Sequence, residues 1–306
     1  MILDPFGRPT TNLRISVTQR CNLRCIYCHR EGETSPDTEM TVDEIVEIVK
    51  LGVELGIKSV KLTGGEPLVR EDILKIVKSI SRIPGVQDLS MTTNGNLLPV
   101  YAEDLAEAGL NRVNISLPTL NEQKYRAITG GDLKPVIAGI KAAVTAGLNP
   151  VKLNMVYMKD INTDEVYSMI DFAAETNTIL QVIELEPVNL DRDFYEKHHA
   201  PLDALIKYLS ERAKEVKVRR NMQNRKVYVL PEAKVEVVPP IENTEFCMHC
   251  TRIRLTSDGK LKPCLMRQDN LVDILTPMRN GADRAVLKNL FIEAIKRRRP
   301  YFIPSR

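Results

Sequence analysis

The sequence lacks the features of a membrane protein or a secreted protein. No apolar run approaches the roughly 18 residues that span a membrane, and the first ten residues have no basic region followed by an apolar stretch. A large excess of one charge is also missing. The 43 Lys and Arg and the 40 Asp and Glu leave a net charge of +3, which permits an anionic substrate but is too small to indicate a nucleic-acid or membrane partner. We therefore expect a cytoplasmic protein with neither of those partners.

Cysteine is scarce, and its positions are grouped. The 306 residues include six cysteines, which form two triplets with none left over: Cys21, Cys25 and Cys28, and then Cys247, Cys250 and Cys264. The cytoplasm disfavours structural disulfides. A chain of this length buries roughly 75% of its unfolded surface, so it needs no disulfide bond to be stable. We therefore expect the cysteines to be free or bound to metal.

The first triplet has the spacing C-x3-C-x2-C. Three thiolates this close in sequence can converge on one centre if the backbone loops around it. Three sulfurs are one short of the four that close a structural zinc site or an ordinary iron–sulfur cluster, so the pattern favours an iron–sulfur cluster with an open coordination position. Two alternatives stay open: a zinc site completed by His29 or a distant residue, and haem attachment, because Cys25–His29 reads as C-x-x-C-H.

The second triplet has the spacing C-x2-C-x13-C. A C-x-x-C turn with a third cysteine across a hairpin is a strong metal signal, and the alternative to a cluster is zinc with His249 as the fourth ligand. Arg252 and Arg254 are two residues apart on an extended segment, so their side chains point to the same face. Two guanidiniums beside a metal with an open position would form a pocket for an anionic ligand with a donor atom.

Strands and helices alternate six times before residue 212. The expected strands are 13–18, 59–63, 88–92, 112–117, 151–157 and 178–185, and the expected helices are 41–55, 71–81, 99–108, 135–146, 164–175 and 201–212. Thr41 and Glu44 form a capping box at the start of the first helix. This alternation predicts an α/β fold with a parallel sheet and right-handed crossovers. Periodicity alone does not distinguish an open doubly wound sheet from a barrel.

The alternation ends near residue 212. Short alternating strands are expected at 217–220, 226–230 and 234–238, a hairpin at 252–256 and 260–263, and a last helix at 285–296. We place a domain boundary between residues 212 and 213. The C-terminal extension of short strands and a helix is expected to close the mouth of the first domain.

The segments around the first triplet resemble a known family. The C-x3-C-x2-C motif with Tyr27 before its third cysteine is similar to the radical S-adenosylmethionine (SAM) superfamily. The lead-in, with Gly7-Arg8, the LRISVT segment at 13–18 and Arg20-Cys21-Asn22, resembles its GTP 3′,8-cyclase family of molybdenum-cofactor biosynthesis. The resemblance implies a (β/α)6 partial TIM barrel in residues 1–212, which holds a first 4Fe-4S cluster. Residues 213–306 would then hold a second 4Fe-4S cluster and the GTP site.

The resemblance also implies which residues contact the ligands. Gly64-Gly65-Glu66-Pro67 would by itself indicate a tight turn, but it resembles the superfamily segment that holds the amino group of SAM. The implied SAM contacts are Tyr27, Gly65 and Ser116. The implied GTP contacts are Arg14, Lys61, Thr92, Lys152, Arg252 and Arg254, with the open iron of the second cluster meeting the guanine. For Lys61 and Lys152 the alternative is a surface lysine at a strand edge.

The family carries out a radical reaction. The resemblance implies that the reduced first cluster cleaves SAM and that the resulting radical removes hydrogen from C3′ of GTP. Ring closure at C8 then gives (8S)-3′,8-cyclo-7,8-dihydroguanosine 5′-triphosphate. The implied partners are a flavodoxin-like or ferredoxin-like electron donor, cyclic pyranopterin monophosphate synthase as the next enzyme, and a second copy of the chain in a homodimer. The alternatives are a peptide-modifying radical SAM enzyme with an auxiliary cluster and a zinc-stapled binding module without catalysis.

The sequence departs from the family at several positions. Lys61 stands where many members have arginine, which keeps the charge but loses the bidentate fork. Gln181 and Glu186 replace an arginine and a methionine of bacterial relatives, and Pro118 stands where relatives often have aspartate. The chain ends in RRRPYFIPSR and lacks the Gly-Gly tail that is associated with activity in bacterial relatives. If that tail is needed, another segment must take its place.

Overall fold

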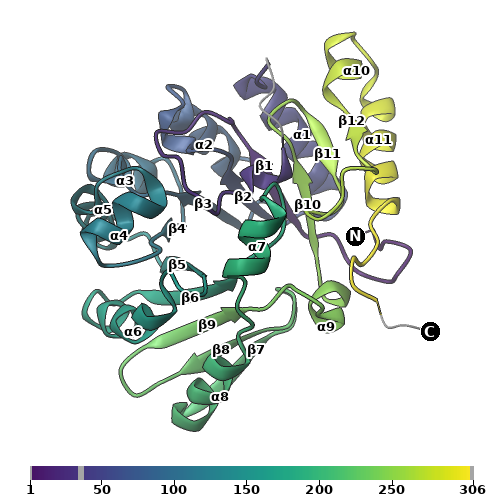
Figure 1. The fold of residues 1–306 in the computed structure, drawn as a ribbon. Coiled ribbons are helices and arrows are strands. Elements are labelled where there is room, and N and C mark those ends of the chain that lie inside the picture. Colours follow the sequence, from purple (N-terminus) through teal and green to yellow (C-terminus); the bar gives the residue numbers. More distant parts are fainter. Residues whose placement is uncertain (1, 34–37, 304–306) are drawn as a thin grey trace.

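The computed structural model describes residues 2–33 and 38–303, and within these ranges the main strands form one sheet (Figure 1). The sheet has twelve strands in the order β12-β11-β10-β1-β2-β3-β4-β5-β6-β9-β8-β7. The strands are β1 (Asn12–Ser16), β2 (Ser59–Thr63), β3 (Asp88–Thr93), β4 (Arg112–Ser116), β5 (Val151–Tyr157), β6 (Ile179–Glu184), β7 (Glu215–Arg219), β8 (Arg225–Val229), β9 (Lys234–Val238), β10 (Arg252–Leu255), β11 (Lys260–Lys262) and β12 (Val272–Asp273).

Most of the helices lie around the outside of the curved sheet, whereas α7 (Arg192–His198) lies near the centre of the view (Figure 1). The other helices are α1 (Val42–Glu54), α2 (Ile73–Ser81), α3 (Leu98–Glu107), α4 (Glu122–Thr129), α5 (Leu133–Thr145), α6 (Val166–Glu175), α8 (Asp203–Arg212), α9 (Thr244–Met248), α10 (Leu275–Arg279) and α11 (Arg284–Lys296). Short 3-10 helices occur at Arg30–Gly32, Pro67–Val69 and Thr163–Glu165. None of the helices in the described ranges has the length and apolar character that crossing a membrane requires.

The predicted alternation of six strands with helices is confirmed in β1 to β6. The predicted capping box begins α1: Thr41 Oγ1 accepts from the backbone N–H of Glu44 (3.3 Å), and Glu44 Oε2 accepts from that of Thr41 (2.7 Å). The sequence did not predict α4, α7, α9 or α10. These helices are short and largely polar, so their apolar periodicity is weak. Asn121 caps α4 by accepting from Lys124 N (3.0 Å).

The two faces of each inner strand have different roles. Leu13 and Ile15 on β1 are fully buried in the core that the helices cover, whereas Arg14 between them lines a cavity on the inner face. Because side chains alternate along a strand, the same arrangement places Lys61 of β2 and Lys152 of β5 on the inner face. The fold therefore directs a set of polar side chains inward.

The prediction for the C-terminal segment was incomplete. Its residues line the cavity, but its strands also extend the sheet at both edges: β10 pairs in parallel with β1, and β9 pairs in parallel with β6. The run from β10 through β1 to β6 and on to β9 is therefore parallel throughout, and the outer strands pair antiparallel. The two predicted domains share one sheet, and the boundary between residues 212 and 213 stays a prediction.

Candidate active site

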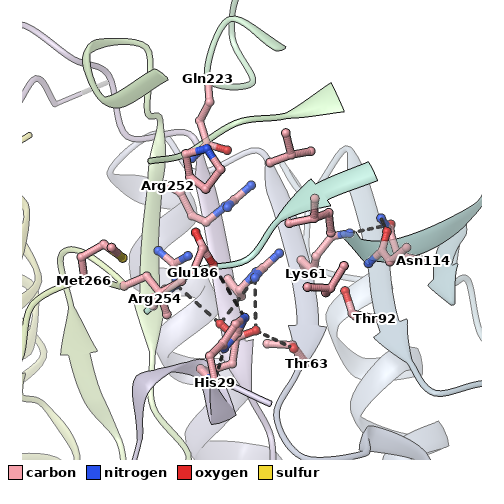
Figure 2. Close-up of a pocket in the computed structure, with 18 of the residues that line it drawn as sticks. His29, Lys61, Thr63, Thr92, Asn114, Glu186, Gln223, Arg252, Arg254 and Met266 are labelled. Carbon is pink, nitrogen blue, oxygen red and sulfur yellow. Dashed lines mark hydrogen bonds and ion pairs between the residues drawn. The ribbon is translucent and has the colours of Figure 1, made fainter. Parts of the chain in front are cut away.

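One cavity at the carboxyl ends of the parallel strands brings the two cysteine triplets together. All six cysteines line it, and all six are free thiols. The first triplet lies in the loop that follows β1, whereas the second comes from α9, the turn after it and the segment after β11. Figure 2 shows part of this cavity, with Arg252 and Arg254 on one side and Lys61 and Thr92 on the other.

The loop of the first triplet forms an environment that suits a cationic centre. Cys28 N donates to Cys25 O (3.1 Å), which tightens the loop. Burial, with the neighbouring thiols of Cys28 and Cys21, raises the pKa of Cys25 to about 12, and burial also raises the pKa of Cys28. Thiols in such a place ionise readily only when a positive centre lies beside them. The residues therefore fit an iron–sulfur cluster bound by three thiolates.

The geometry does not favour a zinc site at either triplet. Sulfurs about 2.3 Å from one zinc ion lie within about 4 Å of each other. In the part of the chain that the structure describes, no three Cys, His, Asp or Glu side chains are grouped closely enough to hold one metal ion. His29 Nδ1 accepts from Glu31 N (3.0 Å), and His249 Nδ1 lies 2.9 Å from Glu245 O, away from the cavity lining. The described residues thus form no tetrahedral ligand set of the zinc type.

Gly64 and Gly65, after β2, pack directly against the loop that leads into the first triplet. Gly65 N donates to Thr18 O (2.7 Å), and Glu66 N donates to Arg20 O (2.8 Å). A Cβ on Gly64 would lie 2.1 Å from Thr18 O, and one on Gly65 would lie 2.2 Å from Arg20 O. The two backbones approach this closely only because neither glycine has a side chain. The turn therefore supports the loop that carries the cysteines.

Replacing Gly65 by alanine is expected to displace that loop. The new methyl group would overlap backbone atoms of Arg20, which have no flexible end to move away, so we expect a loss of roughly 1–3 kcal/mol in stability. The variant should also hold less iron after anaerobic reconstitution. Gly147→Ala is the control, because no atom lies within 4 Å of its new Cβ and only its backbone conformation (φ +78°) is disfavoured. Equal iron contents and equal melting temperatures for the two variants would contradict this packing argument.

Two buried arginines hold the C-x-x-C turn of the second triplet. Arg8 donates to Cys247 O (2.7 Å), and Arg298 donates to Cys250 O. Burial opposes ionisation of Cys250, but the guanidiniums of Arg298 and Arg252 outweigh it and lower the pKa of Cys250. The turn is thus fixed by segments near the two termini, in a setting that favours a thiolate.

Comparison with known proteins identifies the family. The model of the radical SAM superfamily matches residues 15–173, and that of Molybdenum Cofactor Synthesis C matches residues 178–303. A protein of Pyrococcus horikoshii named "Probable GTP 3′,8-cyclase" is 52% identical over 308 residues, which cover 99% of this chain and 98% of the relative. The chain belongs to the GTP 3′,8-cyclase family of the radical SAM superfamily. A relative with the same name from Methanothermobacter thermautotrophicus is 46% identical, with 99% of both chains covered.

Solved structures of other proteins share the fold. Streptococcus suis SuiB bound to S-adenosylmethionine has a TM-score of 0.62 and 19% identity, and SuiB bound to its precursor peptide SuiA has a TM-score of 0.62 and 17% identity. These alignments cover 84% and 85% of this chain but 60% of SuiB. At this level of identity the likeness extends to the fold and no further, and it supports the predicted partial barrel.

In this GTP 3′,8-cyclase family member, every residue that the resemblance implied lines the one cavity: Tyr27, Gly65 and Ser116 for SAM, and Arg14, Lys61, Thr92, Lys152, Arg252 and Arg254 for GTP. Their contacts with ligands stay predictions. The surface alternative for the two lysines is wrong, because Lys61 is 6% and Lys152 5% exposed. Among the departures from the family, Gln181 and Glu186 line the cavity, and so does part of the C-terminal segment: Arg298, Arg299, Tyr301 and Phe302.

Glu31 is a cavity residue that the sequence did not single out. Its carboxylate accepts from Arg14 Nη1 (3.1 Å) and Thr63 Oγ1 (2.9 Å), and it lies 3.5 Å from Arg254 Nε (Thr63 and Arg254 are labelled in Figure 2). Burial opposes its ionisation, but Arg14, His29 and Arg254 together lower the pKa of Glu31 well below its usual range. Glu31 therefore connects β1, β2 and β10. Its place shortly after the third cysteine was the signal that could have identified it.

Several cations in the cavity have donor atoms that no acidic group among the described residues accepts from. Lys61 Nζ donates to an amide, Asn114 Oδ1 (2.7 Å), and burial together with Arg112 and Arg14 lowers the pKa of Lys61. The Nε atoms of Arg14 and Arg252 are buried and have no hydrogen-bond partner among the described residues. Buried donors without a partner are rare in folded proteins. They indicate that a ligand with acceptor atoms belongs here.

The lining of the cavity is strongly basic. Among the described residues it includes twelve Lys and Arg but three acidic residues, all Glu. This excess is larger than the net charge of +3 of the whole chain, so positive charge is concentrated in the cavity. A cleft that has a low dielectric constant and is lined by positive charge attracts anions strongly. The cavity therefore suits an anionic ligand.

The segment after the first triplet is attached to the hairpin that precedes Cys264. Gly32 O accepts from Lys262 Nζ (2.7 Å), and Glu33 Oε2 accepts from the backbone N–H (2.9 Å) and the hydroxyl (2.8 Å) of Ser257. These contacts fix the first cysteine loop relative to the strands of the second triplet. Burial raises the pKa of Glu33 to about 7, although the hydrogen bonds from Ser257 oppose this.

The stability of the protein is expected to depend on the ionisation of Glu33 between about pH 4.5 and pH 7. The pKa of Glu33 is higher in the folded state than in the unfolded state. The stabilisation of the fold by the protonated side chain is therefore fully present below about pH 4.5, and it is lost as the pH rises through about 7. Glu33→Gln should therefore gain melting temperature relative to the wild type at pH 8, where the ionised carboxylate costs up to roughly 3 kcal/mol. At pH 5 the gain should be small or absent. The exposed Glu103→Gln is the control, and a pH-independent difference for Glu33→Gln would contradict the assignment.

Proposed function

We propose that this chain is a GTP 3′,8-cyclase. It would convert GTP to (8S)-3′,8-cyclo-7,8-dihydroguanosine 5′-triphosphate with two 4Fe-4S clusters and SAM, as the first step of molybdenum-cofactor biosynthesis. The observation that carries the proposal is the single basic cavity onto which two triplets of free cysteines open. The identity of 52% over nearly the whole length of a probable GTP 3′,8-cyclase supports the same activity.

Residues around the first triplet would hold SAM. Cys21, Cys25 and Cys28 would bind the first cluster and leave one iron open for the amine and carboxylate of SAM. Tyr27, Gly65 and Ser116 line the same cavity as these cysteines. When bound and reduced, this cluster supplies the electron that cleaves SAM. The role of the chain is to fix SAM close to the substrate and to keep water away from the reacting atoms.

Residues around the second triplet would hold GTP. Cys247, Cys250 and Cys264 would bind a second cluster that contacts the guanine. Arg252 and Arg254 lie on the same face of β10 and both line the cavity, so they would direct donors at the nucleotide. Arg14, Lys61, Thr92 and Lys152 line the same cavity from neighbouring strands. GTP would thus be fixed between the two cluster sites.

The remaining partners follow from this activity. The reaction needs a one-electron donor, for which we propose a flavodoxin-like or ferredoxin-like protein. The product would pass to cyclic pyranopterin monophosphate synthase. We further propose that the protein acts in the cytoplasm and that it forms a homodimer.

The test is anaerobic reconstitution followed by incubation with SAM, a reductant and GTP. We expect about eight irons and eight sulfides per chain, the sum of two four-iron clusters, and 5′-deoxyadenosine that forms only when GTP is present. Deoxyadenosine with a peptide and none with GTP would favour the peptide-modifying alternative. Zinc without sulfide would favour the binding module without catalysis.

A further inference from the structure

The β7–β8 hairpin reaches across the cavity to the second triplet. Its tip, residues 220–224, is attached to the C-x-x-C turn: Gln223 N donates to His249 O (3.1 Å), and Thr251 Oγ1 donates to Asn221 O (3.1 Å). Arg219 and Arg225, at the two ends of this tip, both line the cavity. No motif of the sequence drew attention to either arginine.

Arg219 and Arg225 belong to a cluster around one buried carboxylate. Glu236 on β9 has a fully buried side chain, and it pairs with Arg219 Nη1 (2.9 Å), with Arg225 Nε (3.2 Å) and with Lys152 Nζ. Burial opposes ionisation of Glu236, but the three cations outweigh it and lower the pKa of Glu236 to about 2. Arg225 Nη1 also donates to Gln181 Oε1 (3.4 Å). The carboxylate therefore fixes the direction of all three basic side chains.

The cluster has more positive charge than its own residues neutralise. One carboxylate faces three cations, and the side chains of Arg225 and Lys152 are 6% and 7% exposed. Burial lowers the pKa of Lys152 to about 8 and that of Arg225 to about 10, in spite of the favourable charge of Glu236. Burying cations without full compensation is costly. A cluster that served structure alone would be expected to have its charges balanced.

We propose that Arg219 and Arg225, with Lys152, form a subsite for the polyphosphate tail of the nucleotide. A guanidinium donates to two phosphate oxygens at once, and the excess charge beside Glu236 is compensated when a polyanion binds. Arg219 has a side chain that is 32% exposed, so it is the member of the cluster that an incoming ligand meets first. This proposal rests on the proposed function only in naming GTP as the nucleotide. The three basic side chains would bind any short polyphosphate.

The experiment compares three ligands on anaerobically reconstituted protein: GTP, guanosine and inorganic tripolyphosphate. Their affinities are measured by equilibrium dialysis for the wild type, Arg219→Gln, Arg219→Lys and Arg225→Gln. Arg220→Gln is the matched control, because Arg220 is the next residue of the same hairpin and is exposed outside the cavity lining. We expect Arg219→Gln to lose at least about tenfold in affinity for GTP and for tripolyphosphate. Affinity for guanosine should change less than about threefold, Arg219→Lys should recover part of the loss, and Arg220→Gln should match the wild type.

Two results would overturn the subsite. An equal loss for GTP and guanosine would mean that the hairpin only maintains the shape of the cavity. Unchanged affinity for tripolyphosphate in both Gln variants would mean that the arginines serve Glu236 alone. Failure of the proposed function gives a different pattern: tripolyphosphate binding would still depend on Arg219, but no deoxyadenosine would form with GTP.

Discussion

Cys264→Ala is expected to reduce the iron content from about eight to about four per chain and to abolish product formation from GTP, because the variant would lose one of the two four-iron clusters that we propose. Cys264 is the only cysteine of the second triplet that lies outside the C-x-x-C turn, and it reaches the cavity from the segment after β11. Without it two sulfurs remain, and two thiolates do not hold a four-iron cluster firmly. Iron and sulfide analysis after anaerobic reconstitution measures the effect.

Cys25→Ala is the complementary variant. It should also halve the iron, but it should abolish all formation of deoxyadenosine, whereas Cys264→Ala should keep a slow cleavage of SAM that no longer depends on GTP. His249→Ala is the control, since His249 bonds to Glu245 and lies outside the cavity lining. If His249→Ala lost as much metal as Cys264→Ala, the histidine would be a ligand and the zinc alternative would regain support.

The local features of the fold and of the candidate site could be predicted from the sequence. Thr41 and Glu44 identified the start of α1, because a capping box depends on residues three apart. The shared face of Arg252 and Arg254 followed from the two-residue period of a strand. The six cysteines were recognisable because they form two triplets in the sequence, and the structure places both triplets on one cavity. For the capping box and the strand, the determining interactions lie within a few residues.

The pairings between distant segments could not be predicted in the same way. β10 joins β1 and β9 joins β6, yet short alternating strands give no indication of their neighbours. Periodicity showed that Lys152 belongs to a strand, but it did not show that Glu236, 84 residues later, neutralises it. The pairing of Glu31 with Arg254 could not be predicted for the same reason, because the two residues are far apart in the sequence. A charged residue at an inward position of a strand was the available signal, and its partner became visible only in three dimensions.

Arg298→Met is expected to destabilise the protein by about 3 kcal/mol and to weaken the second cluster site. Arg298 has a fully buried side chain, lies 3.3 Å from Asp4 Oδ2 and donates to Thr10 Oγ1 and Cys250 O. Methionine fills similar space but leaves these acceptors without a donor, and breaking one partner of a buried ionic network costs several kcal/mol. Arg8 still pairs with Asp4 (2.8 Å), which limits the loss.

The measurement is the melting temperature of the reconstituted protein together with the rate at which a chelator removes iron. We expect Arg298→Met to melt roughly 5–10 °C lower than the wild type and to lose about half of its iron faster. Arg297→Met is the matched control, because Arg297 is exposed and its side chain makes only exposed contacts among the described residues. It pairs with Glu293 (2.8 Å), which is worth less than about 1 kcal/mol, and it donates to Leu271 O (2.9 Å). A lower melting temperature with unchanged iron release would limit Arg298 to a role in folding. Faster iron release at an unchanged melting temperature would instead show that its main role is to hold Cys250 in the geometry that the cluster requires.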